Sequence, residues 1–177
     1  MNWKLIEKSI TIDAPAEKVW EVLFTQELNK IWFAEFSEGT QAYTDWQVGS
    51  KAIFKDDSES GIIGKIIVNK LHEELVIEYD GMLMNGKEDF ESKDAKNMKG
   101  VKETYKLVKD GPQTRLDVTV DMDPEYFEMM SESWDRAMDV IKQLAEKSRI
   151  WPPLKEIIAT PQKRGFFILS GKTVKFA

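Results

Sequence analysis

The chain has 177 residues and a mass of 20.5 kDa, which suits one domain or one domain with an extension. Cysteine is absent, which excludes disulfides, zinc–thiolate sites, iron–sulfur clusters and a thiol nucleophile. His72 is the only histidine, so any Ser-His-Asp triad would have to use it. No apolar run approaches the roughly 18 residues of a membrane span, and the N-terminal residues lack a signal-peptide core. We therefore expect a cytoplasmic protein without a membrane span.

The charge is unevenly distributed along the chain. The net charge is −6, but six basic residues and one acidic residue give residues 148–177 a charge of +5 and leave −11 on residues 1–147. An acidic body does not attract phosphate backbones, so we expect no nucleic-acid binding. The basic extension is expected to lie against its own acidic body, with an anionic partner as the alternative. We expect a domain over residues 1–147 and an extension over residues 148–177.

The N-terminal third predicts one strand followed by two short helices. Apolar residues alternate with polar ones over residues 4–12, which is typical of a half-buried strand. Residues 13–17 then carry an Asp and a Pro in the order that begins a helix. Apolar residues follow at helical spacing, and a second short helix is expected over residues 26–33.

The middle of the chain predicts antiparallel strands. The β-rich runs are residues 51–55, 61–69, 74–79, 102–109 and 114–122, and Asp110-Gly111-Pro112 predicts a turn between the last two. Gly61 and Gly64 are expected to mark a bend or bulge that lets the sheet curve. The charged residues 82–100 are expected to form a long loop or a loose hairpin.

The last third predicts one long helix from Asp123-Pro124 to about Lys147. Its apolar side is wider than a coiled-coil seam, and a curved antiparallel sheet supplies a broad concave partner for such a face. Within the extension, residues 166–169 and 173–176 flank a Ser-Gly-Lys turn and predict a hairpin. In the predicted long helix, the apolar positions recur at spacings of three and four: Phe127, Met130, Trp134, Met138, Ile141 and Leu144.

This order of elements resembles the helix-grip fold of the START-like, or SRPBCC, superfamily. Specific similarity lies in residues 10–23 (ITIDAPAEKVWEVL), 27–33 (ELNKIWF), 46–50 (WQVGS) and 132–135 (ESWD). Together they resemble the branch named for homologues of an activator of the heat-shock-protein ATPase, over about residues 3–147. The resemblance implies an α+β fold: a curved antiparallel sheet wrapped around a long C-terminal helix, with two short helices after the first strand.

The resemblance also implies a deep cavity between the sheet and the long helix, which in the superfamily holds lipids, hydrophobic metabolites or polyketides. Large aromatic and methionine side chains are the candidates to line it, since they fill irregular apolar pockets. The alternative for each is a place in the packed core. The candidates are Trp32, Trp46, Tyr79, Met82, Met84, Tyr105, Met130, Trp134 and Met138.

Glu103 is the best single candidate for a catalytic residue. It shares a strand face with Tyr105 and Leu107, so it points into the cavity if that face is concave. A buried carboxylate can act as a general acid or base, whereas a partnered one at a strand end is structural. His72 is expected in an exposed turn without a catalytic role. We expect no metal and no cofactor.

The main functional hypothesis is non-catalytic binding of a hydrophobic small molecule, either a lipid or an aromatic metabolite. One alternative is a lyase, cyclase or hydrolase that uses Glu103 with Tyr79 or Tyr105. Polar groups converging inside the cavity would favour that enzyme, and a uniformly apolar lining would favour binding. Another alternative is a co-chaperone-like ATPase activator with an exposed interaction patch. A homodimer through the extension is a further hypothesis.

Overall fold

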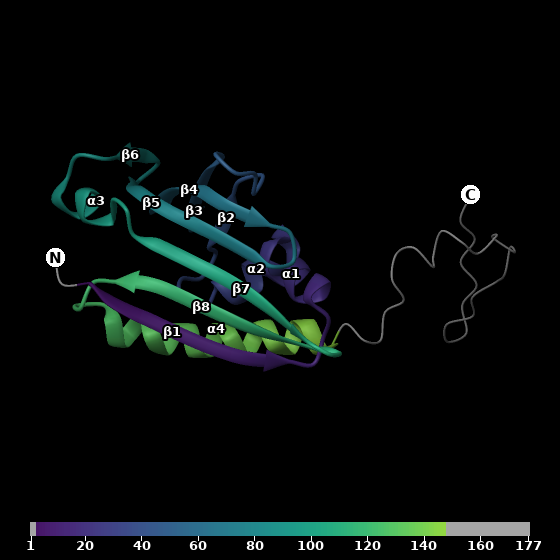
Figure 1. The fold of residues 1–177 in the computed structure, drawn as a ribbon. Coiled ribbons are helices and arrows are strands. Elements are labelled where there is room, and N and C mark those ends of the chain that lie inside the picture. The colour runs from purple at the N-terminus through teal and green to yellow at the C-terminus, as the bar shows by residue number, and fades with distance from the viewer. Residues whose placement is uncertain (1–2, 148–177) are drawn as a thin grey trace, which may run out of the picture.

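The computed structural model describes residues 3–147 (Figure 1). The predicted hairpin, the extension and the homodimer through it lie outside the described residues. In the described residues, eight strands form one antiparallel sheet in the order β1-β8-β7-β5-β4-β3-β2, and β6 pairs with β5. The strands are β1 (Lys4–Ile12), β2 (Gln41–Tyr43), β3 (Lys51–Lys55), β4 (Gly61–Lys70), β5 (Glu74–Met84), β6 (Lys87–Asp89), β7 (Lys102–Asp110) and β8 (Gln113–Met122).

Four helices accompany the sheet in the described part of the chain: α1 (Ala16–Phe24), α2 (Gln26–Phe33), α3 (Lys93–Met98) and α4 (Phe127–Lys147). The long helix α4 runs along β1 and β8, and it also contacts α1 and α2 (Figure 1). The sheet is curved and open, which confirms the predicted helix-grip architecture.

The inward face of α4 confirms the predicted periodicity. Trp134 and Met138 are buried in the core, with exposed fractions of 2% and 3%, and Ile141 is fully buried. Met130, nearer the start of the helix, is half-buried. Opposite them lie alternate residues of β1 and β8, such as Ile6 and Val118, because successive strand residues point to opposite faces. The core therefore lies between the sheet and α4.

Gly64 marks an irregularity in the sheet, as its sequence position predicts. The pairing of β4 with β5 shifts register between Ile63 and Gly64. A β-carbon at Gly64 would lie 2.7 Å from the carbonyl oxygen of Glu78 and 2.9 Å from the ring of Tyr79. Only glycine permits this close approach of the two strands. Gly64 thereby helps to place Tyr79.

The connections differ from the predictions in three places. Residues 82–100, expected as a long loop or a loose hairpin, do contain a hairpin, since β5 continues to Met84 and pairs with β6. The helix α3 was not expected; it begins after Ser92, whose Oγ accepts a hydrogen bond from the backbone N–H of Ala95. The short strand β2 was not predicted. Helix α4 begins at Phe127 rather than at Asp123, because residues 124–126 form a turn in which the N–H of Tyr126 donates to the carbonyl of Asp123.

Candidate functional site

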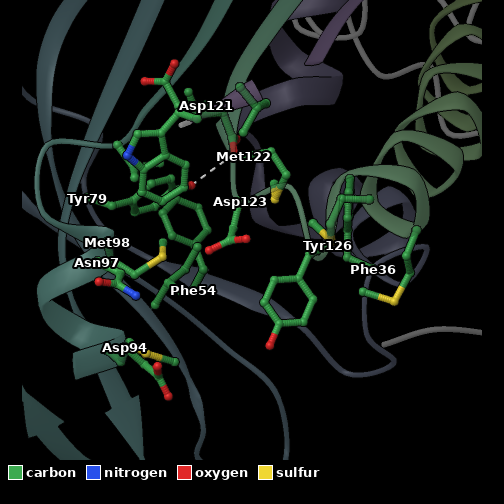
Figure 2. A pocket seen from close by; sticks show the side chains of 18 of the residues that line it. Phe36, Phe54, Tyr79, Asp94, Asn97, Met98, Asp121, Met122, Asp123 and Tyr126 are labelled. Carbon is green, nitrogen blue, oxygen red and sulfur yellow. Dashed lines mark hydrogen bonds between the residues drawn. The ribbon is translucent and has the colours of Figure 1, made fainter. Parts of the chain in front are cut away.

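A cavity of about 530 Å³ lies between the sheet, α3 and the first half of α4 (Figure 2). Figure 1 shows α3 at the same end of the sheet as the start of α4. The wall is formed by Trp3, Trp32, Phe33, Phe36, Thr40, Phe54, Ile62, Tyr79, Met82, Lys93, Asp94, Asn97, Met98, Val101, Glu103, Val120, Asp121, Met122, Asp123, Glu125, Tyr126, Met129, Met130 and Trp134.

One side of the cavity is built from aromatic rings in mutual contact. The ring of Trp134 lies 4.9 Å from that of Phe36 and 6.0 Å from that of Trp32, measured between ring centres. The Nε1–H of Trp32 donates to the carbonyl of Val22 at 3.2 Å, so this indole is fixed by α1. Edge-to-face and tilted contacts of this kind hold the rings in defined orientations. The aromatic wall is therefore rigid and apolar toward the cavity.

Two tyrosine hydroxyls donate to one carboxylate in the wall. Glu103 and Tyr105 are two residues apart on β7, so their side chains share a face. Tyr79 comes from the neighbouring strand β5. The hydroxyl of Tyr79 donates to Oε2 of Glu103 at 3.1 Å, and the hydroxyl of Tyr105 donates to Oε1. Tyr79 and Glu103 line the cavity, while Tyr105 lies behind them against Trp134.

Burial changes the protonation chemistry of this cluster. Burial raises the pKa of Glu103 above its ordinary value, and the hydrogen bonds from Tyr105 and Tyr79 oppose the rise. Burial and the nearby Glu103 carboxyl raise the pKa of Tyr79 and Tyr105 well above the ordinary tyrosine value. Both phenols therefore stay protonated near neutral pH and act as donors. Glu103 can accept a hydrogen bond from a ligand or exchange a proton with it.

The raised pKa of Glu103 predicts a pH dependence of stability. We expect the unfolding free energy of the wild type, relative to that of Glu103→Gln, to fall as the pH rises from about 4.5 through the pKa of the folded state. The folded protein keeps this proton to a higher pH than the unfolded chain does, so the unfolded chain binds fewer protons over this window. Urea titrations at a series of pH values measure the difference.

The matched control for this measurement is Glu132→Gln, at an exposed position of α4. The unfolding free energy of the wild type relative to that of Glu132→Gln should not fall over the pH range in which Glu103 titrates. A wild-type stability that rises relative to Glu103→Gln over the same window would contradict the assigned direction of the pKa shift.

Six of the residues predicted from sequence meet in the cavity wall: Trp32, Tyr79, Met82, Glu103, Met130 and Trp134. The others lie elsewhere. Trp46 packs against Phe24 and Phe54, Tyr105 stands behind Glu103, and Met138 is in the core. Met84 is 47% exposed on β5 and does not line the cavity. Contact of any of these residues with a ligand stays a prediction.

His72 lies in the turn between β4 and β5, with a φ of 63° and its ring 5.9 Å from that of Trp20. This contact gives it a packing role at the end of the sheet, away from the cavity. Within residues 3–147, no group of histidine, aspartate and glutamate side chains is arranged to hold a metal ion.

The cavity wall also includes residues that the sequence did not reveal as a site. They are Asp94 of α3, Asp121 near the end of β8, and Asp123, Glu125 and Tyr126 between β8 and α4. Figure 2 shows these side chains, except that of Glu125, with their labels. Asp123 was predicted only as a helix cap. Residue spacing gives no sign that α3 and the segment from the end of β8 to α4 meet here, because only the tertiary fold joins them.

None of the helices described between residues 3 and 147 is long and apolar enough to cross a bilayer.

A search of curated protein sequences found no match. Solved structures of the same fold include protein MLL2253 from Mesorhizobium loti, at 14% identity and a TM-score of 0.66, with 83% of this chain and 100% of that chain covered.

Two further structures extend the comparison. The Aha1 dimer from Colwellia psychrerythraea has 17% identity and a TM-score of 0.64, covering 82% of this chain and 98% of that one. CalU16 from Micromonospora echinospora has 17% identity and a TM-score of 0.57, covering 81% of this chain and 76% of that one. At sequence identities this low, the similarity shows a shared fold and nothing more.

The family of this chain is identified by comparison of its sequence with a family model. The model of the family described as "Activator of Hsp90 ATPase homolog 1-like protein" matches residues 13–146, from the end of β1 to the last turn of α4. This match spans both short helices, the strands from β2 to β8 and nearly all of the long helix. The chain therefore belongs to the family of activator of Hsp90 ATPase homolog 1-like proteins, within the START-like (SRPBCC) superfamily.

Proposed function

We propose that this protein binds a hydrophobic small molecule, a lipid or an aromatic metabolite, in the cavity between the sheet and α4. The cavity volume of about 530 Å³ carries this proposal. It falls within the range of roughly 300–1,000 Å³ that is typical of ligand pockets. Sixteen of the 24 residues of the wall are aromatic, methionine or aliphatic, and the other eight are polar or charged and can orient a ligand.

The size of the cavity argues against a simple packing defect. Protein interiors are packed as densely as organic crystals, and voids larger than a water molecule are few. A void lined by large side chains lowers stability, since its lining loses contacts on one side. Here the aromatic contacts of Trp134 with Trp32 and Phe36 support the wall rather than fill the space. A ligand would supply the missing contacts.

Binding of a neutral fluorescent probe tests the proposal. Anthracenylmethanol, an aromatic alcohol, should bind the full chain saturably with one molecule per chain, measured by fluorescence titration and by native mass spectrometry. Native mass spectra of the freshly purified protein should also be inspected for a ligand retained from the expression host. A linear, unsaturable fluorescence response together with no bound species in the mass spectrum would refute the proposed function.

A second candidate function is acid–base catalysis on the bound molecule. The observation that favours it is the convergence of Glu103 and Tyr79 in the cavity wall, joined by a hydrogen bond of 3.1 Å. Compounds extracted from wild type and from Glu103→Gln protein, expressed identically, discriminate the two functions. The same compound in both supports binding alone. A precursor in the variant and its product in the wild type support catalysis.

A further inference from the structure

We propose that the ligand carries a hydroxyl group at its buried end, and that this hydroxyl donates a hydrogen bond to the carboxylate of Glu103. The site therefore selects alcohols and phenols over ethers of the same apolar skeleton. This inference rests on the proposed binding function and specifies its ligand class. It holds whether or not the bound molecule reacts further.

The carboxylate of Glu103 lies in an otherwise apolar part of the sheet. Glu103 pairs with Ile77 of β5 on one side and with Val120 of β8 on the other. Directly paired residues point to the same face, and these two are buried, with exposed fractions of 0% and 3%. An apolar side chain at position 103 would complete this face without the cost of burying a charge. Ionisable groups placed in this way beside a cavity are typical of functional sites.

The hydrogen bonds of Glu103 leave part of its capacity unused. An ionised carboxylate offers about four acceptor positions. Tyr79 donates to Oε2 at 3.1 Å and Tyr105 donates to Oε1, so each oxygen has one partner. Among residues 3–147, no other side chain donates to either oxygen, and no lysine or arginine forms an ion pair with Glu103. The remaining positions can accept a donor from the ligand.

A ligand reaches these acceptor positions from the cavity. Glu103 and Tyr79 both line it, whereas Tyr105 does not. Tyr79 and Tyr105 are only 3% and 1% exposed, while Glu103 is half-buried and keeps part of its surface accessible. Within this group of three, the surface that a ligand can contact is therefore mainly that of Glu103.

The backbone and the core hold the group in place before any ligand binds. The N–H of Tyr79 donates to the carbonyl of Val101 at 2.8 Å, and the N–H of Gly100 donates to the carbonyl of Tyr79 at 2.9 Å. Tyr105 is packed in the core on the other side of Glu103. An acceptor that is already oriented loses little freedom on binding, so its hydrogen bond adds to both affinity and specificity.

A hydroxyl suits this acceptor better than other polar groups do. A carboxylate ligand would bring a second negative charge beside Glu103 in an apolar cavity. A protonated amine would lose its hydration, and pairing of two charges in an apolar interior often fails to offset that cost. An ether has no donor and leaves the acceptor positions empty. A hydroxyl is neutral and donates one hydrogen bond.

Three probes with one skeleton test the inference on the full chain: anthracenylmethanol, methoxymethylanthracene and methylanthracene. The alcohol donates and accepts, the ether only accepts, and the hydrocarbon does neither. Fluorescence titration near neutral pH should show the alcohol binding about tenfold more tightly than the ether, because hydrogen bonds to charged groups are among the stronger ones. An ether that binds as tightly as the alcohol would overturn the inference.

The variant Glu103→Gln identifies the acceptor. Glutamine keeps the size and one accepting oxygen but removes the charge, so binding of the alcohol should weaken about fivefold while binding of methylanthracene stays nearly constant. The advantage of the alcohol over the ether should then fall to about twofold. Glu132→Gln, at an exposed position of α4 outside the cavity, is the matched control and should change no affinity. A tenfold preference that persists in folded Glu103→Gln would mean that another group, or the larger size of the ether, causes it.

Proton release on binding gives a second readout that needs no variant to fold. A donated hydrogen bond favours the ionised carboxylate, so the alcohol should release more protons than methylanthracene does within the pH window in which Glu103 titrates. Calorimetry in buffers of different ionisation enthalpy measures the difference. Equal release by the two probes, or greater uptake with the alcohol, would overturn the inference.

Other titratable groups are separated from Glu103 by the same calorimetry on Glu103→Gln, in which they all remain. A difference between the probes that persists in this variant would come from them and contradict the assignment. Tyr79 of β5 and Tyr105 of β7 donate to Glu103 directly. The further charged groups of the cavity wall are Lys93, Asp94, Asp121, Asp123 and Glu125.

The outcomes separate this inference from the function on which it rests. If the alcohol, the ether and the hydrocarbon all bind saturably without a preference that depends on Glu103, the ligand class is wrong while the binding function stands. If no probe binds, the proposed function fails and the ligand class fails with it.

Discussion

Replacing Trp134 by alanine is expected to lower the unfolding free energy by about 3–5 kcal/mol. The indole is 2% exposed and contacts the rings of Trp32, Phe36 and Tyr105. Its removal deletes a large apolar surface and enlarges the cavity where α4 meets the sheet, and such a site collapses only partially. Urea and thermal denaturation of the full chain measure the loss.

Trp134→Phe is the matched control, because it retains an aromatic ring and loses only part of the volume. It should cost clearly less than Trp134→Ala. If both variants unfold at the same urea concentration as the wild type, Trp134 does not hold α4 against the sheet, and the packing described for the cavity wall is wrong.

Replacing Met130 by tryptophan is expected to weaken binding of anthracenylmethanol by at least about tenfold, or ~1.4 kcal/mol. Met130 lines the cavity from α4 and is half-buried, so the larger indole occupies space that the probe needs. Because the cavity is open space, filling it should disturb the packed core less than adding atoms to a filled interior. Fluorescence titration measures the affinity, and denaturation checks the fold.

Met84→Trp is the matched control for this variant. It makes the same substitution at an exposed position of β5 that does not line the cavity. Binding should be unchanged in Met84→Trp. Equal losses in the two variants, or wild-type affinity in a folded Met130→Trp, would mean that the probe binds somewhere other than the cavity.

The framework of the fold follows from patterns that the sequence carries locally. The alternation over β1 and the spacing of Trp134, Met138 and Ile141 each report one buried face, and the structure confirms both. The turn at Gly111 joins β7 to β8 as expected, with a φ of 58° that favours glycine. These features depend on near neighbours, so a single sequence displays them.

The connections were harder because their structure depends on distant partners. Helix α3 has six residues, too few for a clear apolar period, and is fixed by the Ser92 cap and by the buried Ala95. The strand β6 exists through its pairing with β5. Phe90 reaches back to Gly81, where a β-carbon would lie 2.4 Å from its ring. Asn85-Gly86, with positive φ at both residues, is a local signal for the β5–β6 hairpin, whereas the contact of Phe90 with Gly81 has none.

The candidate site divides in the same way. The aromatic and methionine lining was foreseen in part, since large apolar residues on inward faces are the natural wall of such a cavity. Trp46 and Met138 have the same residue types and spacing but pack into other parts of the core. The acidic residues of the wall were not foreseen, because charged residues in connections usually indicate solvated turns. Their place beside the cavity comes from the packing of α3 near the segment between β8 and α4.

The most direct test of a ligand-binding cavity is nuclear magnetic resonance of the full chain with carbon-13 in the methionine methyl groups, titrated with anthracenylmethanol. Methionines in the wall should shift and show contacts to the probe, whereas Met84 and Met138, which lie outside the wall, should not. Contacts confined to Met84, or no change at any methionine at saturating probe, would contradict the account. The wall methionines are Met82, Met98, Met122, Met129 and Met130.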